Sequence, residues 1–348
     1  MSFSHTILHW YSLHKRNLPW RNTIDPYKIW LSEIMLQQTR VAQGTPYYMS
    51  FVENFPTVHH LANASEEKVL KLWQGLGYYS RARNLHTTAK KVSHEFNGEF
   101  PKTYKELLKL KGIGDYTASA IASICFNEQR AVVDGNVYRV LARYFGIDLA
   151  INSTEGTKYF REIAAKVMHV SNIRDYNQAI MEFGALQCAP KNPNCIQCPL
   201  QDSCMALQND MVSVLPKKIN KTKIKNRFFN FLVVVDAENN TMLTQRKGKG
   251  IWQNLYQFPL LESDMELDLH AVEASYAQIL PHISKAEVRL FNANVIVHKL
   301  SHQHLHTRFW IVNTNAIVTD GISFSTLEKF PVPVLISDFI KTFKNSYF

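Results

Sequence analysis

Residues 110–118 read LKGIGDYTA, a Gly-x-Gly turn between two segments with helical apolar spacing, TYKELLKL and TASAIASICF. Gly112 and Gly114 would let backbone amides approach a phosphate closely, and the N-terminus of the second helix favours negative charge. A dinucleotide-binding turn would need a preceding strand and a third glycine, where Thr117 stands. Two glycines at a helix junction can also be purely steric. Taken with the basic charge of the chain, the stretch favours a helix–hairpin–helix that holds a nucleic-acid backbone.

The composition agrees with a soluble, basic protein. The chain has 348 residues, a net charge of +10 and 46% hydrophobic residues. This length predicts two domains, and the basic surplus favours a polyanionic partner. Residues 1–20 lack the apolar core of a signal peptide, and no apolar run is long enough to span a membrane. We therefore expect a cytoplasmic protein that does not enter a membrane.

The chain changes character near residue 215. Apolar spacing is mostly helical up to Cys204, whereas residues 228–246 and 292–312 read as strand, the first with an Asn-Asn turn. Between the helical part and the first strand stretch, LPKKINKTKIKNR at 215–227 carries six basic residues and no acid. This is typical of a solvated linker that can also follow phosphates. We expect a helical domain at 1–215, a basic linker at 216–227 and an α+β domain at 228–348.

Four of the five cysteines lie within seventeen residues, with the spacing C-x6-C-x2-C-x5-C: Cys188, Cys195, Cys198 and Cys204. In a reducing compartment, clustered cysteines are more often metal ligands than disulfides. Four thiolates suit tetrahedral zinc or a [4Fe–4S] cluster, and the single close pair favours the cluster because zinc ribbons usually show two pairs. Zinc and incidental buried thiols stay open. Cys125 lies in an apolar stretch, and we expect it to pack in the core.

Two carboxylates stand out. Glu33 interrupts the largely apolar run IWLSEIML, so it lies either on the polar face of a helix or buried with a raised pKa, which would suit a general acid. Asp134 falls between an apolar run and a helix, where an N-cap is the ordinary role of Asp. Two carboxylates in different surroundings can divide acid and electrostatic roles at a glycosidic bond.

Several blocks resemble the adenine-specific DNA glycosylases of base-excision repair, the MutY family, almost from end to end. They are LPWR at 18–21, SEIMLQQT at 32–39, LWQGLGYYSRARNL at 72–85, LKGIGDYTA, VDGNVYRVLAR at 133–143 and the cysteine block. The resemblance implies a multidomain fold, in which an all-α helix-hairpin-helix glycosylase domain with an iron–sulfur loop precedes an α+β Nudix-like domain. It also implies a [4Fe–4S] cluster on the four cysteines.

The same resemblance implies a mechanism. Adenine is flipped out of the duplex into a pocket. Glu33 then matches the general acid that protonates adenine N7, Asp134 matches the carboxylate that stabilises the oxocarbenium-like sugar, and Tyr116 matches its neighbour. Bifunctional relatives carry Lys at the position of Tyr116 and form a Schiff base, which a phenol cannot do. We therefore expect a monofunctional enzyme.

Further positions are matched by the resemblance. Those that line the adenine pocket are Trp20, Arg21 and Glu182. Those that insert into the base stack near the opposite base are Gln38 and Tyr78. Tyr78 could fill the gap left by the flipped base, with Leu76 beside it. Aromatic residues beside glycines also commonly pack helix junctions, and this is what we expect of Tyr79.

The C-terminal half resembles the family's Nudix-like domain from QR at 245–246 and GIWQNLYQFP at 250–259. The Glu-rich metal box of active Nudix hydrolases is absent, which predicts recognition without hydrolysis. The family's Phe-Ser-His loop, which reads 8-oxoguanine, appears here as Leu300, Ser301 and His302, so the aromatic is lost while two hydrogen-bonding groups remain. His302, His304 and His306 also alternate on one strand face as in a metal site, but an exposed polar face is the favoured interpretation.

These observations predict a monomeric adenine DNA glycosylase acting on double-stranded DNA with A:8-oxoG or A:G mispairs. An endonuclease III-like pyrimidine glycosylase/lyase is the alternative enzyme, and Tyr116 argues against it. A non-catalytic DNA-binding scaffold would keep Gly112, Gly114 and the cysteines, but it would not need Glu33 or Asp134.

Overall fold

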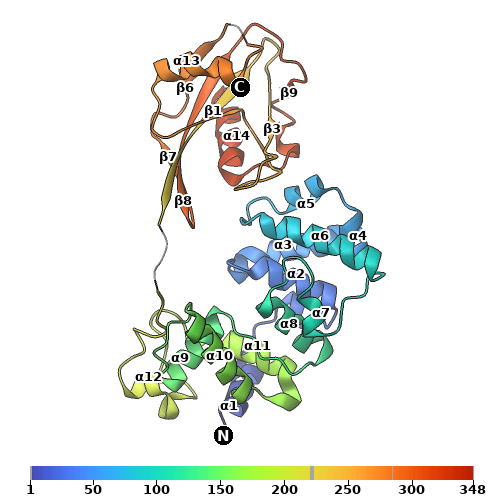
Figure 1. Ribbon diagram of the computed structural model, residues 1–348, viewed down its shortest axis with the longest axis vertical. Coiled ribbons are helices and arrows are strands. Elements are labelled where there is room, and N and C mark those ends of the chain that lie inside the picture. Colours follow the sequence, from blue (N-terminus) through green and yellow to red (C-terminus); the bar gives the residue numbers. More distant parts are fainter. Residues whose placement is uncertain (1, 220–222, 284, 348) are drawn as a thin grey trace. The chain divides into compact units, whose positions relative to one another are not determined.

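A computed structural model describes residues 2–219, 223–283 and 285–347 of the chain (Figure 1). The chain forms two compact units. The helical unit comprises Met1–Asn63 and Asn84–Asn220, and the sheet unit comprises Ala64–Arg83 and Lys221–Phe348. No helix in the described ranges is both long enough and apolar enough to cross a membrane.

The helical unit is built from helices joined by short loops. They are α1 (Phe3–His14), α2 (Pro26–Leu36), α3 (Val41–Asn54), α4 (Val58–Asn63), α6 (Ser80–Glu95, whose first turn belongs to the sheet unit), α7 (Tyr104–Leu107), α8 (Asp115–Phe126), α9 (Gly135–Phe145), α10 (Thr154–Val167), α11 (Ile173–Leu186) and α12 (Met205–Gln208). Three 3₁₀ turns, η1 (Pro19–Arg21), η2 (Val170–Asn172) and η3 (Gln201–Ser203), complete it.

Helix α8 lies at the centre of this unit. Every residue from Thr117 to Ile124 is buried, as expected for a helix that is apolar or small on all sides. It packs against α2, α7 and α11, and α11 in turn packs against α1 and α9. The N-terminal ends of α8 and α9 and the middle of α2 are thereby held on one rigid framework.

The Gly-x-Gly turn joins α7 to α8 as a helix–hairpin–helix. Gly112 has φ +79°, and an added Cβ would lie 2.8 Å from Cβ of Asn84, so this position needs glycine both for its conformation and for space. Gly114 is the N-cap of α8 and leaves the first amides of that helix uncapped by a side chain. Thr88 fixes the turn by donating its hydroxyl to the carbonyl of Lys111 at 2.7 Å.

The sheet unit contains α5 (Glu66–Leu72), a mixed sheet and two covering helices, α13 (Leu269–Ile279) and α14 (Val334–Tyr347). Its main strands are β1 (Lys225–Val235), β5 (Leu260–Ser263), β6 (Glu287–Leu290), β7 (Ile296–Leu300) and β8 (Gln303–Asn313), in the order β5-β1-β8-β6 with β7 also paired to β8. Shorter strands are β2 (Asn240–Thr241), β3 (Thr244–Gln245), β4 (Tyr256–Gln257) and β9 (Ile322–Ser323), and η4 is Leu327–Lys329.

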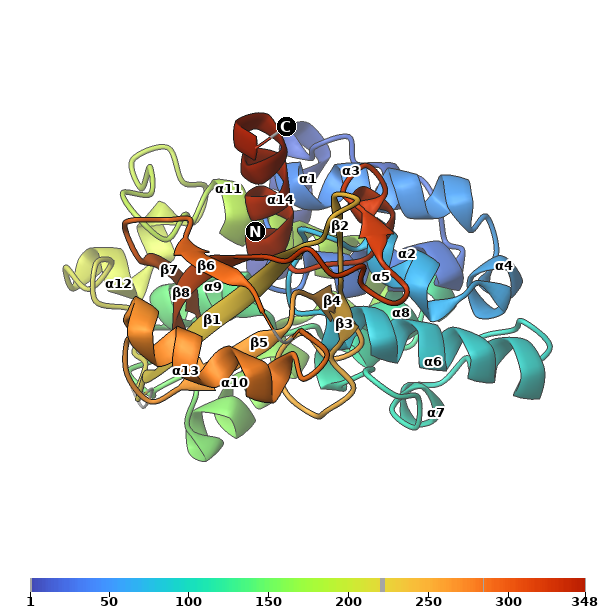
Figure 2. The ribbon, with the colours of Figure 1, turned by 90° about the horizontal axis from the view of Figure 1, so that it is seen from above.

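The two covering helices lie on opposite faces of β1 and β8 (Figure 2). Val272 of α13 packs with Leu232, Trp310 and Val312 on one face. On the other face the ring of Phe339 from α14 stacks on Phe309 at 3.9 Å. Strands β1 and β8 run parallel while their other neighbours run antiparallel, so the predicted α+β class is confirmed.

Two details differ from the sequence prediction. Residues 292–312 do not form one strand: β7 and β8 are an antiparallel hairpin whose two-residue turn is Ser301 and His302. The dipeptide Ser-His carries none of the Asn-Gly or Gly signals that mark such turns, which is why the pattern reads as continuous strand. In addition, β1 begins at Lys225, inside the stretch predicted as linker, because it pairs along its whole length with β8.

Candidate active site

A cavity of about 350 Å³ in the helical unit brings together residues from five separate parts of the sequence. The residues predicted from the sequence that line it are Trp20, Arg21, Glu33, Gln38, Tyr116, Asp134 and Glu182. They come from η1, α2 and the residues after it, the first turn of α8, the N-cap of α9, and α11. The framework around α8 therefore places three acids and a phenol on one concave surface.

Glu33 is buried in α2 with only 7% of its surface exposed, so the polar-face alternative is wrong. Burial raises the pKa of its carboxyl to about 7, and the charge of Asp134 acts in the same direction, while a hydrogen bond with Tyr116 opposes both. At neutral pH a large fraction of Glu33 therefore carries a proton. A protonated carboxyl next to a cavity is what a general acid requires.

Asp134 is the N-cap of α9 and also lines the cavity, so both interpretations of this residue hold. Its Oδ1 accepts the backbone amides of Asn136 and Val137 at 2.9 and 2.8 Å, and its Oδ2 accepts the Asn136 side-chain amide at 2.8 Å. Burial raises the pKa of the carboxyl, and these hydrogen bonds oppose the rise. Both oxygens are thus held in a fixed orientation at the cavity wall.

Tyr116, in the first turn of α8, lies between these acids. Burial and the nearby charges of Glu33 and Asp134 raise its pKa well above the ordinary value, so the phenol stays neutral. Its hydroxyl donates to the sulfur of Met181 at 3.2 Å. The side chain can therefore support a neighbouring carboxyl by hydrogen bonding, but it offers no amine.

Glu182 on α11 has the opposite environment. It is buried, yet it accepts Nε of Arg16 at 2.8 Å and both terminal nitrogens of Arg21 at 2.8 and 2.7 Å. Burial alone would raise its pKa, but the hydrogen bonds from the two arginines outweigh burial and hold the pKa at about 2. One cavity thus contains an acid that holds its proton near neutral pH and an acid that is always ionised.

Arg16 was missed by the sequence analysis, as were other residues that line the cavity: Leu18, Leu36, Gln37, Thr39, Val41, Gly135, Asn136, Gln178, Met181 and Ala185. Part of this set carried a signal. Gln178, Met181 and Ala185 lie four and one residues before and three residues after Glu182, which is the spacing of one helix face. Arg16 carried none, because its partner is 166 positions away in the chain.

Comparison with known proteins places this site in a family. Residues 31–167 match the model of the HhH-GPD superfamily base excision DNA repair proteins, and residues 230–342 match the NUDIX domain. The chain is 37% identical to the adenine DNA glycosylase of Buchnera aphidicola subsp. Baizongia pistaciae, over 89% of this chain and 86% of that protein. The chain belongs to the adenine DNA glycosylase family.

Other relatives agree with this membership. The adenine DNA glycosylase of Buchnera aphidicola subsp. Schizaphis graminum is 37% identical over 76% of each chain. Among solved structures, a thermostable thymine-DNA glycosylase is 31% identical with a TM-score of 0.55, and it covers 60% of this chain and 95% of its own. The predicted fold class, a helix–hairpin–helix glycosylase domain followed by a Nudix-like domain, is confirmed by these matches.

In this family member the remaining predicted contacts gather in the sheet unit. Tyr78 has φ +46° and is about half exposed, and its hydroxyl lies 2.7 Å from Oγ of Ser301 in the β7–β8 turn. A cavity of about 570 Å³ is lined by both, together with Leu76 and His302. Tyr79 is buried, as expected for a residue that packs the junction.

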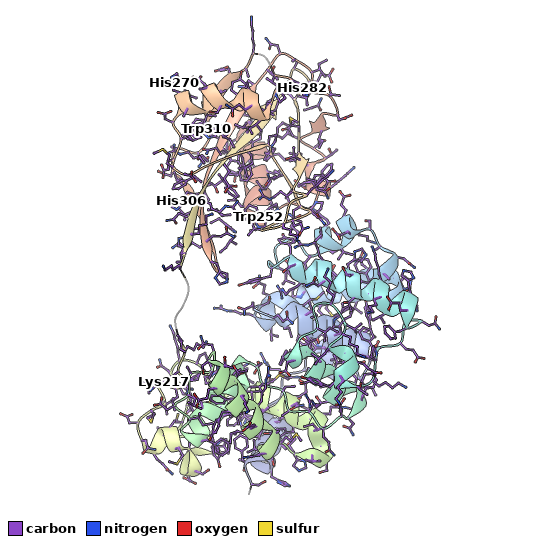
Figure 3. All side chains as sticks on the ribbon, in the orientation of Figure 1. Lys217, Trp252, His270, His282, His306 and Trp310 are labelled. Atoms are coloured by element: carbon purple, nitrogen blue, oxygen red, sulfur yellow. The ribbon has the colours of Figure 1, made fainter. Side chains whose placement is uncertain are left out.

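One of the alternating histidines, His306, contacts the neighbouring strand. In the described part of the chain, no three His, Cys, Asp or Glu side chains are arranged to hold a metal ion. His306 instead stacks on Phe228 at 4.9 Å, and its Nε2 lies 3.2 Å from Oδ1 of Asn226. Figure 3 shows His306 nearer than Trp310 to the end of the sheet that carries the turn.

The cysteine loop is joined to helix α9. Arg143 donates to Sγ of Cys188 at 3.4 Å, and Cys204 donates its thiol to the Arg143 carbonyl at 3.6 Å. Arg139 donates to the Cys188 carbonyl at 2.7 Å and to Oδ1 of Asn136 at 2.9 Å. The loop is therefore fixed to the same helix whose N-cap is Asp134.

The thiols of the chain are unpaired. All five cysteines are free of disulfides. Burial raises the pKa of Cys198 to about 11 and that of Cys125 to about 12. Cys125 is only partly buried, so it packs at the margin of the core rather than inside it.

Proposed function

We propose that this protein is a monofunctional adenine DNA glycosylase of base-excision repair, which hydrolyses the N-glycosidic bond of adenine mispaired with 8-oxoguanine or guanine in double-stranded DNA. The protein belongs to a family of DNA N-glycosylases, which are hydrolases. The observation that carries the proposal is the protonated, buried Glu33 in one cavity with the fixed carboxylate of Asp134 and the ionised Glu182.

The site supports a dissociative hydrolysis. Adenine, extruded from the duplex, occupies the cavity. Glu33 donates its proton to N7, the N9–C1′ bond breaks, and its electron pair leaves with the base. The sugar becomes an oxocarbenium-like cation, and the Asp134 carboxylate, already oriented by α9, stabilises it. Water then bonds to C1′ and gives up a proton to a carboxylate of the site, which restores the enzyme.

We assign the selection of adenine to the part of the cavity wall formed by Glu182 and its two arginines. The Glu182 carboxylate, held ionised by Arg16 and Arg21, offers acceptors toward an amino group, while the arginines offer donors toward ring nitrogens. We assign Trp20 to the stacking surface of the pocket and Gln38 to contacts near the opposite base. The backbone turn at Gly112 and Gly114 is proposed to hold a DNA phosphate.

The test of the catalytic assignment is Glu33→Gln, which keeps the shape and removes the transferable proton. Single-turnover excision of adenine should fall by at least the roughly 10²–10⁴-fold that general acid catalysis supplies, while binding to the mispaired duplex survives. Asn226→Ala, a change in the sheet unit, is the control. Near-normal excision by Glu33→Gln would refute the assignment.

Monofunctional chemistry follows from Tyr116. A Schiff base needs an amine, and the phenol at this position has none. Borohydride trapping should give little covalent adduct beside an endonuclease III-like enzyme with lysine at this position. Efficient trapping would favour the pyrimidine glycosylase/lyase alternative, and excision of oxidised pyrimidines would confirm that alternative.

Recognition of 8-oxoguanine is assigned to the β7–β8 turn. This base differs from guanine by an O8 acceptor and an N7–H donor, and Ser301 and His302 offer a hydroxyl and an imidazole at an exposed turn. The hydrogen bond to Tyr78 holds the Ser301 hydroxyl in place. Leu76 lines the same cavity and is assigned to insertion beside the lesion. Leu300 leaves the turn without an aromatic stacking surface.

The four cysteines are proposed to hold a [4Fe–4S] cluster. Four thiols suit such a cluster in number and kind: Cys188, Cys195, Cys198 and Cys204 are free and share one loop, and the first and last both contact Arg143. In the described structure their side chains are not gathered into a metal site. When bound, the cluster would supply a structural staple for this loop, and no step of hydrolysis passes through it. Purified protein should contain about four iron atoms per chain, and stoichiometric zinc without iron after anaerobic purification would refute the assignment.

We also propose the domain division 1–215, 216–227 and 228–348, in which the last linker residues, from Lys225, already pair in β1. We further propose a monomeric state and a cytoplasmic location in which the protein associates with the nucleoid through DNA. The basic composition supports contact with DNA, since a net charge of +10 favours a polyanion.

A further inference from the structure

A second cavity, of about 540 Å³, adjoins the adenine cavity in the helical unit. The two share Arg16, Trp20, Arg21 and Gln178 as a common wall. The residues that line only the second cavity are Tyr11, Lys15, Asn17, Asn22, Thr23, Ile24, Ile124, Arg174 and Asp175. Its volume lies within the roughly 300–1,000 Å³ of small-molecule sites, and no step of adenine hydrolysis uses it.

The wall of this cavity is positively charged. It carries the cations Lys15, Arg16, Arg21 and Arg174, against the single carboxylate of Asp175. Glu182, behind the wall, supplies one further negative charge, which Arg16 and Arg21 share. Four cations against two carboxylates leave an excess of two positive charges, which is the charge of a phosphate dianion with opposite sign.

The guanidinium of Arg174 lacks a hydrogen-bonding or ion-pair partner among the described residues. Its side chain is half-buried, and its Nε is shielded from solvent without a hydrogen bond. A shielded donor without a partner needs an explanation. A ligand anion would supply the missing partner.

Lys15 is similar. It has no acidic partner among the described side chains, and its Nζ lies 5.6 Å from the centre of the Tyr11 ring. The guanidinium of Arg21 lies 5.5 Å from the same ring. Tyr11 therefore stands between two cations, and burial raises the pKa of its phenol, so it cannot neutralise them at physiological pH.

We propose that this cavity binds a phosphate group. Arginine and lysine that converge on a concave surface are the usual phosphate ligands, since guanidinium donates two parallel hydrogen bonds and ammonium supplies a point charge. The cavity has room for more than the phosphate, and Tyr11 and Trp20 give it aromatic walls. The phosphate group belongs either to a free mononucleotide or to a DNA strand, and both sources use the same cations.

The direct test measures binding of inorganic phosphate and of adenosine 5′-monophosphate by titration calorimetry, at constant ionic strength. The variant is Lys15→Gln with Arg174→Gln, which leaves both arginines of the adenine cavity in place. Wild-type protein should bind at least one of the two probes saturably, and the double variant should bind it at least tenfold more weakly. Lys90→Gln, an exposed lysine on α6, is the matched control and should bind like the wild type.

Two further measurements assign the source. If the phosphate is that of a free nucleotide, adenosine monophosphate binds more tightly than phosphate, and the double variant binds undamaged duplex normally. If it is that of DNA, the double variant lowers the slope of log affinity against log salt for undamaged duplex by about one per lost contact. Thermal melting of the wild type, the double variant and the single variant Lys15→Gln shows whether each protein is folded. If the double variant does not fold, the binding tests are made with Lys15→Gln alone.

The proposal is overturned if neither probe binds saturably and the salt slope is unchanged, or if the double variant binds the probes as the wild type does. Adenine excision in phosphate-free buffer, measured on the same proteins, reports on the proposed function separately. At saturating enzyme, where DNA affinity does not limit the rate, excision should be unchanged in the double variant, because neither Lys15 nor Arg174 lines the adenine cavity.

Discussion

Replacing Glu33 by glutamine should stabilise the helical unit, and the gain should grow with pH. The carboxyl is buried, and its pKa of about 7 lies above the ordinary 4.5. Between these values the folded state binds more protons than the unfolded state, so the stability falls as the pH rises through this window. The glutamine side chain of the Glu33→Gln variant has nearly the same shape and carries no charge, and it therefore escapes this loss.

The magnitude follows from the two pKa values. At 1.36 kcal/mol per pKa unit, the full difference between 4.5 and about 7 corresponds to about 3 kcal/mol, reached near pH 8. Near pH 5 the folded state is fully protonated and the unfolded state only partly ionised, which leaves about 1 kcal/mol. The stabilisation by Glu33→Gln should thus increase by about 2 kcal/mol between these two conditions.

Urea unfolding followed by far-UV circular dichroism measures this difference, with wild type and variant compared at both pH values. Glu182→Gln is the contrast, because its carboxyl has a pKa of about 2 and stabilises the fold at every pH above 4.5. That stabilisation fades only as the pH falls from 4.5 towards 2, so Glu182→Gln should lose about 3 kcal/mol at both conditions. A Glu33→Gln gain that is the same at both pH values would refute the reasoning.

Excision should also depend on the pH through Glu33: the single-turnover rate should fall as the pH rises above about 7, because the proton donor is lost, and a flat profile would contradict this. Asp134→Asn should keep the N-cap and change stability by about 1 kcal/mol or less, yet lower excision by about 10²-fold or more; excision that stays within a few-fold of wild type would remove Asp134 from the mechanism. Ser301→Ala with His302→Ala should lower the preference for adenine opposite 8-oxoguanine over guanine, by about 1–3 kcal/mol per lost contact in binding assays, and an intact preference would locate the lesion reader elsewhere. Cys198→Ser should lower iron content and soluble yield, whereas normal iron content would exclude it as a ligand.

Most of the fold could be predicted from the sequence, because short segments of the chain determine most of its helices and turns. The turn LKGIGDYTA needs a positive φ at Gly112, and the helices beside it carry their own apolar spacing. Local information fails where the turn signal is absent, and the β7–β8 hairpin was therefore read as a single strand. Local information also fails at the start of β1. Its first residues have the composition of a linker, and they form a strand because they pair with β8.

The candidate site was less accessible than the fold. The sequence identified Glu33 but left its burial open, because one acid in an apolar run fits either face of a helix. Arg16 could not be found, since the ion pair that holds Glu182 joins residues 166 positions apart. Positions with a motif were visible, whereas positions defined only by a tertiary contact were not.

The two glutamates of the cavity show why the tertiary contacts decide the chemistry. Glu33 and Glu182 are both buried on helices, and by residue type and burial alone both would hold their protons. The pair of arginines at Glu182 reverses this outcome and keeps it ionised, while burial and the charge of Asp134 raise the pKa of Glu33 to about 7. The arginines that ionise Glu182 also form the shared wall of the second cavity, where their positive charge exceeds what Glu182 neutralises. A single arrangement therefore accounts for the proposed base-binding wall on one side and for the excess positive charge on the other.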